Sequence, residues 1–248
     1  MLKVAVINQK GGTGKTTSVI NLGVALASLK QKVLLIDLDA QANLTYSFGI
    51  TEPRGSIAEV LQGKQTIQAI LINKEGLDIA PASLGLADME VSLTNKIGRE
   101  GILRDKLQGL KDYDYIFIDC PPSLSVLTVN ALNYANQVLI PLQVEILALQ
   151  GLNLLLNTIR EVRSVLNKDL EVMGIIPSMF DSRRNLSNEV LQELKKTSKE
   201  RIFKTLIREC VKIAEAPSFA QSVLAYAPGS NGSEDFISLA REIINLRG

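Results

Sequence analysis

A glycine-rich segment between a short apolar run and a helical run constrains this chain more than any other feature. Leu2–Ile7 is apolar and rich in β-branched residues, and Lys15–Leu29 carries apolar side chains at helical spacing. Between them lies Lys10-Gly11-Gly12-Thr13-Gly14-Lys15-Thr16-Thr17. A strand that turns through glycines directly into a helix can bind phosphate through backbone N–H groups and the helix N-terminus. The segment therefore predicts a phosphate loop, and residues 10–17 are candidate nucleotide-binding residues.

The residue types of this loop suit a nucleoside triphosphate. Its three glycines lack Cβ atoms, so the backbone can turn tightly and direct N–H groups at phosphate oxygens. Lys15 is expected to bind the β- and γ-phosphates, Thr16 to offer a hydroxyl to Mg²⁺, and Thr17 to hydrogen-bond a phosphate oxygen. The alternative is an ordinary glycine turn followed by a solvated lysine.

The rest of the chain alternates between short β-branched runs and longer helical patterns. Further strands are predicted at Lys32–Asp37, Leu77–Ala80, Tyr115–Asp119, Gln137–Pro141 and Leu170–Ile176, and helices at Leu84–Leu93, Leu103–Leu110, Ser125–Tyr134, Leu147–Leu166, Ser187–Lys199 and Asp235–Leu246. The alternation predicts an α/β fold with a doubly wound, mostly parallel sheet and helices on both faces. With no linker or repeat, residues 1–248 are interpreted as a single domain. The pattern is weakest over Thr51–Lys74, where one short helix is expected at Ile57–Leu61.

Composition removes several other classes of protein. Counts of 27 Lys plus Arg and 26 Asp plus Glu give a net charge of +1, so no field of one sign covers the chain. The absence of histidine excludes His-based triads, and Cys120 and Cys210 are too few for a disulfide framework. The N-terminal apolar run is too short for a signal peptide, and no run reaches membrane-spanning length. We therefore expect a cytoplasmic protein with no membrane partner.

Two further apolar strands end in carboxylates. Asp37 and Asp39 follow one strand, and Asp119 follows another. Ligands of open α/β sheets bind at the carboxyl ends of the strands, where a carboxylate can hold Mg²⁺ through water. Aspartate after a strand is also a common turn or capping residue, and this alternative is strongest for Asp37.

These motifs together resemble one known family. The two lysines of Lys10–Thr17 resemble the deviant Walker A motif K-G-G-x-G-K-[ST] of the ParA/MinD P-loop ATPases, whereas the ordinary consensus would require glycine at Gln9. Asp37–Asn43 resembles the family segment D-x-D-P-Q-[AG]-N, with Ala40 in place of proline. The resemblance covers almost the whole chain.

The resemblance implies a Mg²⁺-dependent ATP hydrolase that forms a homodimer with ATP. It assigns catalytic roles to Lys10, Lys15 and Asp39, where Asp39 positions the attacking water and Lys10 crosses the dimer interface to the other copy's nucleotide. It places Thr16, Asp37 and Asp119 at the metal site. Pro217 is a candidate for the adenine pocket.

Two other stretches resemble the ParA/Soj-type partition branch of the family, namely Pro121–Leu132 and Ala214–Phe219. This branch implies ATP-bound dimers that bind double-stranded DNA nonspecifically, a location on the nucleoid, and a ParB-type centromere-binding partner that stimulates hydrolysis. The expected function is chromosome or plasmid partition.

Positive charge is concentrated in the segment from Asp181 to Lys212, which holds nine basic and five acidic residues. Phosphate-backbone binding needs such a concentration, although a solvated helix face would show the same lysines. Arg183 matches a family position associated with DNA contact. The further candidates are Arg184, Arg208 and Lys212.

Rival functions remain within the same superfold. A MinD-like, membrane-cycling regulator of division-site placement needs a basic amphipathic C-terminal helix, whereas Glu234–Gly248 mixes three acids with two arginines. An iron-protein reductase needs cluster cysteines at a dimer axis, a pattern that the two cysteines do not match. A ParA-like positioner of another cellular cargo would share every motif described above.

Overall fold

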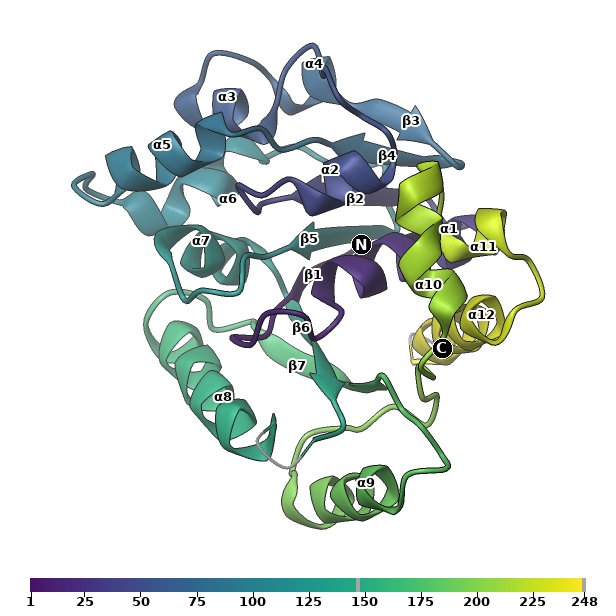
Figure 1. The fold of residues 1–248 in the computed structure, drawn as a ribbon. Helices are drawn as coiled ribbons and strands as arrows, with labels where there is room; N and C mark the ends of the chain where they lie inside the picture. The colour runs from purple at the N-terminus through teal and green to yellow at the C-terminus, as the bar shows by residue number, and fades with distance from the viewer. Residues whose placement is uncertain (146–147, 247–248) are drawn as a thin grey trace.

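The computed structural model describes residues 1–145 and 148–246. Within them, seven strands form one sheet in the order β3-β4-β2-β5-β1-β6-β7 (Figure 1). The strands are β1 (Leu2–Val6), β2 (Val33–Asp37), β3 (Ile72–Lys74), β4 (Leu77–Ala80), β5 (Tyr115–Asp119), β6 (Gln137–Gln143) and β7 (Glu171–Ser178). All neighbouring strands are parallel except the antiparallel pair β3 and β4. The predicted mostly parallel sheet is confirmed, and its antiparallel edge falls in the stretch where the sequence pattern is weakest.

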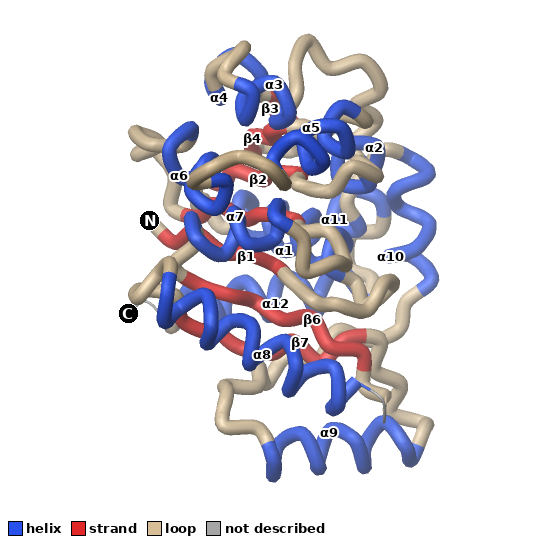
Figure 2. Tube along the Cα trace, turned by 90° about the vertical axis from the view of Figure 1, so that its left-hand side faces the viewer, coloured by secondary structure: helices blue, strands red, loops and turns tan. Residues whose placement is uncertain are grey.

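Helices cover both faces of the sheet. Figures 1 and 2 show α7 (Val126–Tyr134) and α8 (Ala148–Val165) on one face, and α1 (Lys15–Ser28) and α12 (Asn231–Asn245) on the other. The shorter helical elements are α2 (Asn43–Ser47), α3 (Ile57–Gln62), α4 (Ile67–Ile70), α5 (Gly85–Leu93), η1 (Arg99–Gly101), α6 (Ile102–Lys106), α9 (Asn185–Thr197), α10 (Val211–Glu215), η2 (Ala216–Phe219) and α11 (Val223–Tyr226). This arrangement is the doubly wound layering that the alternating pattern predicts.

The central strands are apolar at nearly every position because their side chains enter two separate cores. Ala5 and Ile118 pack in the core under α7 and α8. Their neighbours along the strands, Val6 in β1 and Phe117 in β5, pack in the core under α1 and α12. Every residue of β2 and β5 is buried as a result. Burial on both faces is what distinguishes these strands from the alternating pattern of a half-exposed sheet.

The strand register brings the predicted motifs to one edge of the sheet. β5 lies between β1 and β2, and Asp119 is in register with Val6 on one side and with Asp37 on the other. The glycine loop that follows β1 therefore begins beside both carboxylates. Just after the end of β7, a bridge between Phe180 and Arg208 brings the segment before α10 to the same edge of the sheet.

The elements that the sequence pattern did not predict are short. β3, α2, α4, α10 and α11 span three to five residues each. A helical or strand period needs more residues than these elements contain. The predicted helix over Leu147–Leu166 is present as α8, and its first residue lies outside the described part of the chain.

Candidate active site

The glycine loop has the backbone geometry of an anion site. Gly12 and Gly14 have φ of +74° and +87°, a left-handed conformation that favours glycine. An added Cβ would meet nothing within 4 Å at either position, so backbone conformation rather than crowding requires these glycines. Gly14 is the N-cap of α1 and has no side chain to occupy the free N–H groups of the helix. These N–H groups are therefore available to a phosphate.

Lys15 brings a buried positive charge to this loop. The residue is 7% exposed, and its Nζ donates a hydrogen bond to the carbonyl oxygen of Lys10 at 3.2 Å. Burial lowers the pKa of Lys15, and the negative charges of Asp119 and Asp39 oppose this shift. Lys15 forms no ion pair with the described residues. Its charge is thus not neutralised by a direct partner.

The three threonines of the loop have two different surroundings. Thr13 is buried, and its carbonyl oxygen accepts a hydrogen bond from the Ser178 hydroxyl at 3.0 Å, which ties the loop to β7. Thr16 and Thr17 line the cleft described below. Thr13 therefore helps to fix the conformation of the loop, and Thr16 and Thr17 are accessible to a ligand.

Asp37 is fully buried and hydrogen-bonded by its own chain. Its Oδ2 accepts from the Thr45 N–H at 2.9 Å and the Thr45 hydroxyl at 2.6 Å, and its Oδ1 accepts from the Asp39 N–H at 3.3 Å. Burial raises the pKa of Asp37 to about 6, and the hydrogen bonds from Thr45 oppose the rise. The structure therefore places Asp37 as the residue that shapes the turn from β2 into α2.

Asp119 differs from Asp37 in having its oxygens unsatisfied. Both carboxylate oxygens are buried without a hydrogen-bond partner among the described residues. Burial, followed by the charge of Asp37, raises the pKa of Asp119, while the nearby side chains of Thr16 and Lys15 lower it. A buried carboxylate without partners is costly unless a ligand, ion or water satisfies it. This side chain is therefore the best candidate to receive the water shell of a metal.

No group of three or more carboxylate or thiol side chains in the described residues could hold a metal by itself. Magnesium commonly keeps several waters and takes only one or two protein ligands together with phosphate oxygens. The hydroxyl of Thr16 and the orphaned carboxylate of Asp119 fit that kind of site.

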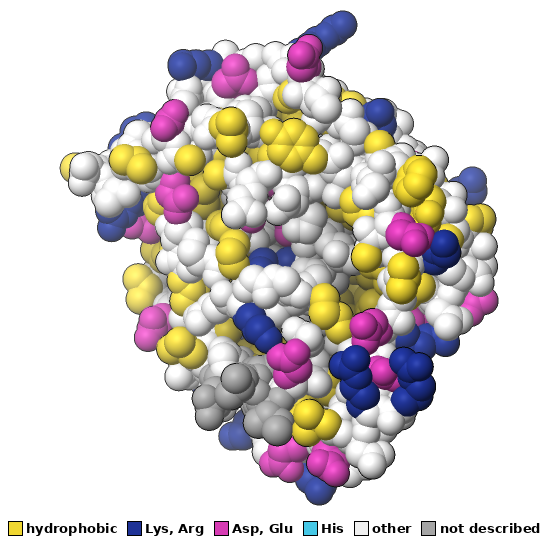
Figure 3. Space-filling view, in the orientation of Figure 1, with side chains coloured by type: hydrophobic (Ala, Val, Ile, Leu, Met, Phe, Trp, Pro, Cys, Tyr) yellow, Lys and Arg dark blue, Asp and Glu magenta, His cyan; other side chains and the backbone are white. Residues whose placement is uncertain are grey.

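A cleft of about 330 Å³ lies over the glycine loop. Its lining residues are Gly11, Gly12, Gly14, Lys15, Thr16, Thr17, Asp39, Gln41, Asn43, Ser47, Pro122 and Met179. Asp39 is 9% exposed and accepts a hydrogen bond from the Gln41 N–H at 2.9 Å. The hollow opens near the centre of the face shown in Figure 3. It brings Lys15, Asp39 and the glycine loop around one space.

A second cavity of about 480 Å³ adjoins the first. The two share Gly14, Thr17 and Met179 in their lining, so together they form one crevice. The lining of the second includes apolar Ile207, Ile213, Pro217 and Phe236. This side is suited to a planar base, while the loop side is suited to phosphates.

Sequence reasoning found Pro217 in this apolar wall but missed Met179, Ile207 and Cys210. Met179 has a φ of +53°, which turns the chain after β7 into the crevice. These residues follow β7 or lie in irregular segments, and they form no contiguous motif. Backbone contacts between the segment after β7 and the segment before α10, including the bridge between Phe180 and Arg208, bring them together.

Lys10 does not face the cleft over its own loop. It is absent from the described lining of that cleft, and its Nζ lies 2.6 Å from Glu145 Oε2. The two lysines of the motif therefore point in different directions.

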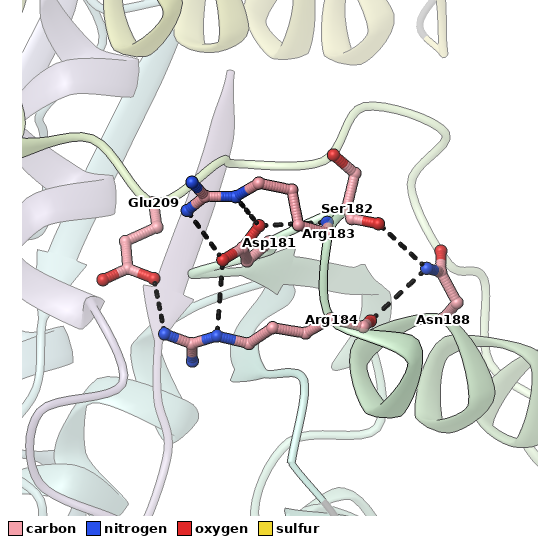
Figure 4. A network of polar contacts seen from close by, with 6 residues as sticks. All are labelled: Asp181, Ser182, Arg183, Arg184, Asn188 and Glu209. Atoms are coloured by element: carbon pink, nitrogen blue, oxygen red, sulfur yellow. Dashed lines mark hydrogen bonds and ion pairs between the residues drawn. The ribbon is translucent and has the colours of Figure 1, made fainter.

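The four candidate DNA-contact residues each pair with a carboxylate. Figure 4 shows Arg183 forming a two-point contact with Asp181, Nε to Oδ1 at 2.9 Å and the terminal nitrogen to Oδ2 at 3.0 Å. The Nε of Arg184 lies 3.3 Å from the same carboxylate, and its terminal nitrogen lies 3.5 Å from Glu209. The other two pairs are Arg208 with Asp235 at 2.6 Å and Lys212 with Glu215 at 2.9 Å.

Exposure separates these four residues. The side chain of Arg183 is 87% exposed, that of Arg184 65%, that of Lys212 50% and that of Arg208 42%. Arg184 and Arg208 also line the larger cavity. The face shown in Figure 3 mixes basic and acidic side chains rather than presenting one sign. Arg183 is therefore the candidate best placed to meet a large polyanion, and Arg184 and Arg208 lie beside the crevice.

The glycine loop, the buried lysine and the carboxylates at the carboxyl edge of a parallel sheet define a P-loop nucleoside triphosphatase. A family model described as an AAA domain matches residues 1–172. The chain is 42% identical over 245 residues to the sporulation initiation inhibitor protein Soj of Bacillus subtilis, with 97% of each chain covered. It is also 42% identical over 249 residues to the chromosome partitioning protein ParA of Caulobacter vibrioides, covering 98% of this chain and 93% of that one.

A solved structure gives the same fold. Cobyrinic acid a,c-diamide synthase from Mycobacterium smegmatis, with a bound ATP analogue and magnesium, superposes with a TM-score of 0.86 at 36% identity. The match covers 98% of this chain and 93% of that chain. The chain belongs to the family of the Soj and ParA partition ATPases, which confirms the predicted resemblance. In the described residues, no helix is long and apolar enough to cross a membrane.

Proposed function

We propose that this chain hydrolyses ATP with Mg²⁺, dimerises around ATP and, as a dimer, binds DNA nonspecifically to drive chromosome or plasmid partition. One observation carries the proposal: Lys15, Asp39 and Asp119 converge on the loop, while Lys10 points out of the cleft. The first three suit hydrolysis within one chain. Lys10 does not face this cleft, and it suits a contact with a second copy of the chain.

The hydrolysis step follows from the residues around the cleft. The loop N–H groups and Lys15 would hold the β- and γ-phosphates and stabilise negative charge as the bond between the γ-phosphorus and the bridging oxygen breaks. Asp39 would orient the water that attacks the γ-phosphorus. Thr16 and Asp119 would hold Mg²⁺, with Asp37 near its water shell, and the metal neutralises phosphate charge when bound. The apolar wall with Pro217 would take the adenine.

Dimerisation gives Lys10 its role in this proposal. Two triphosphates that face each other across a two-fold axis repel, and a lysine from each copy on the other's nucleotide would offset that repulsion. Support comes from the relative in Caulobacter vibrioides, which is named chromosome partitioning protein ParA. The partner would be a ParB-type centromere-binding protein, and the protein would act in the cytoplasm on the nucleoid.

Binding to nonspecific duplex DNA, measured against anionic liposomes with ATP and with ADP, tests the proposal. We expect ATP-dependent DNA binding that weakens steeply with salt and no gain in liposome binding. Lys15→Ala is the matched control, because it should weaken the effect of ATP at a concentration that just saturates the wild type. ATP-dependent liposome binding without DNA binding would favour the MinD-like function, and binding to neither would contradict the proposed DNA-binding function.

The partner is tested by turnover. A ParB-type protein from the same genome, loaded on its centromere-like DNA, should raise the rate of ATP hydrolysis. Hydrolysis that stays at the basal rate with DNA and this protein present would contradict the partition pathway.

A further inference from the structure

Lys10 is held by the end of β6 in its own chain. Its Nζ lies 2.6 Å from Glu145 Oε2 and 3.5 Å from Gln143 Oε1. Gln143 is the last residue of β6 and also lines the larger cavity. The lysine that distinguishes this loop from an ordinary phosphate loop is therefore bound beside the crevice.

The backbone around this contact is fixed on both sides. The Asn8 side chain donates to the carbonyl oxygen of Pro141 in β6 at 2.7 Å and accepts from the Lys10 N–H at 3.1 Å. The Glu145 N–H donates to the carbonyl oxygen of Gln143 at 2.8 Å. Asn8 thus ties the start of the loop to β6. The two charged groups meet from anchored backbone segments rather than from two independent loops.

We propose that Glu145 is a positioning residue that holds Lys10 in the nucleotide-free chain and must release it before two ATP-bound copies associate. The inference rests on the proposed ATP dimer. A triphosphate from a second copy carries more negative charge than one carboxylate, so it can displace Glu145 from the ammonium group. ADP offers one phosphate group fewer and competes less well. Glu145 would therefore sharpen the dependence of dimerisation on the γ-phosphate.

The expected size of the effect is modest. The side chains of Lys10 and Glu145 are 51% and 42% exposed, and an ion pair of this exposure changes an equilibrium by at most about fivefold. Each dimer breaks two such pairs, so the effect on its dissociation constant is at most about 25-fold.

The first measurement concerns the nucleotide-free chain and does not depend on dimerisation. Acylation of Lys10, followed by mass spectrometry, should be several-fold faster in Glu145→Gln than in the wild type, with Lys168 as the internal reference. The exposed residue Glu171, at the start of β7, supplies the matched control, and Glu171→Gln should leave the rate at Lys10 unchanged. Equal Lys10 rates in the wild type and Glu145→Gln would overturn the proposal.

The second measurement is the dimer dissociation constant by sedimentation in an Asp39→Ala background, with ATP and with ADP. Glu145→Gln should tighten the ATP dimer by up to about 25-fold and allow some dimer with ADP, and added salt should shrink the difference. A wild-type ATP dimer that Glu145→Gln does not tighten overturns the role of Glu145 alone. A parent protein that stays monomeric with ATP overturns the proposed dimer as well.

Discussion

Lys15 carries its charge inside the protein against a single carbonyl oxygen, the main-chain oxygen of Lys10. A negatively charged ligand would interact with the ammonium group more strongly than this neutral carbonyl oxygen does. We therefore expect the charge of Lys15 to stabilise bound phosphate more than it stabilises the nucleotide-free fold.

Replacing Lys15 with Ala should weaken ATP affinity by about 10- to 100-fold, because it removes a charge-assisted contact to phosphate. Titration with a fluorescent ATP analogue measures the loss. Lys168→Ala, at an exposed position, is the control and should bind like the wild type. An unchanged affinity in Lys15→Ala would remove this lysine from the phosphate site.

A substitution at Asp39 should slow ATP hydrolysis without preventing ATP binding. It lines the cleft over the loop and is proposed to orient water rather than to hold nucleotide. Asp39→Ala should therefore bind ATP but hydrolyse it at least about 100-fold more slowly, which traps the dimer. Single-turnover hydrolysis and gel filtration with ATP test the two parts. Normal hydrolysis by this variant would refute the assigned role.

At the scale of elements, β2 and α2 are joined by a buried carboxylate. Thr45 of α2 donates twice to Asp37 at the end of β2, and this link sets the direction of the chain through Asp39. The link is also sensitive to pH, because burial raises the pKa of Asp37 from 3.8 to about 6. The folded chain therefore binds a proton there more tightly than the unfolded chain does.

The stability that Asp37 contributes through this proton is fully present below pH 3.8 and is lost as the pH rises to about 6. Without Mg²⁺ and nucleotide, the free energy of unfolding of the wild type should therefore fall between pH 5 and pH 7.5 more steeply than that of Asp37→Asn, because Asn has no proton to lose. The amide of Asn cannot accept the hydrogen bonds that both oxygens of Asp37 accept, so the variant is compared by this pH dependence and not by its absolute stability. Urea unfolding at both values measures the difference, with exposed Asp88→Asn as the control. Equal pH dependence in the wild type and Asp37→Asn would contradict this account.

The loop between β7 and α9 carries the prediction on DNA. Arg183 is exposed but paired with Asp181, so phosphate must compete with that carboxylate. If it contacts DNA, Arg183→Glu should lose nonspecific DNA affinity while keeping ATP-driven dimerisation, and wild-type binding should fall with salt. Mobility shifts over a salt series decide this. Lys199→Glu in the same basic segment is the comparison, and equal losses would support a general charge effect instead.

The predictable part of the site is the part encoded in contiguous segments. The loop of residues 10–17 and the strands before Asp37 and Asp119 carry local patterns, and the parallel register then brings them together. The apolar wall with Ile207 and Cys210 could not be predicted, because it depends on a bridge between irregular segments. The Glu145 contact with Lys10 likewise joins distant residues without a motif.

At the scale of the whole molecule, the two cores share one sheet, and α12 packs against α1. We therefore propose that residues 1–248 unfold as one domain. Urea unfolding followed by far-ultraviolet circular dichroism and by tyrosine fluorescence should give coincident transitions.

A substitution at Phe236 tests whether the chain unfolds as one domain. The residue is fully buried in the core under α1 and α12. Phe236→Ala should lower the free energy of unfolding by about 3–5 kcal/mol and move both signals together. Phe219→Ala, at a 60% exposed position, should cost far less. Two separated transitions in either protein would mean two independently folding units.

The position of α12 in the chain also bears on synthesis. All seven strands have left the ribosome once Ser178 has emerged, yet Val6 and Phe117 on one face of the sheet still lack the cover that α12 supplies. The wall that contains Ile207 and Pro217 is then also incomplete, so nucleotide cannot stabilise the nascent chain through it. A nascent intermediate of this kind exposes an apolar sheet face, the sort of surface that chaperones bind. The order of elements thus leaves this face of the sheet covered by α1 without α12 until the last helix docks.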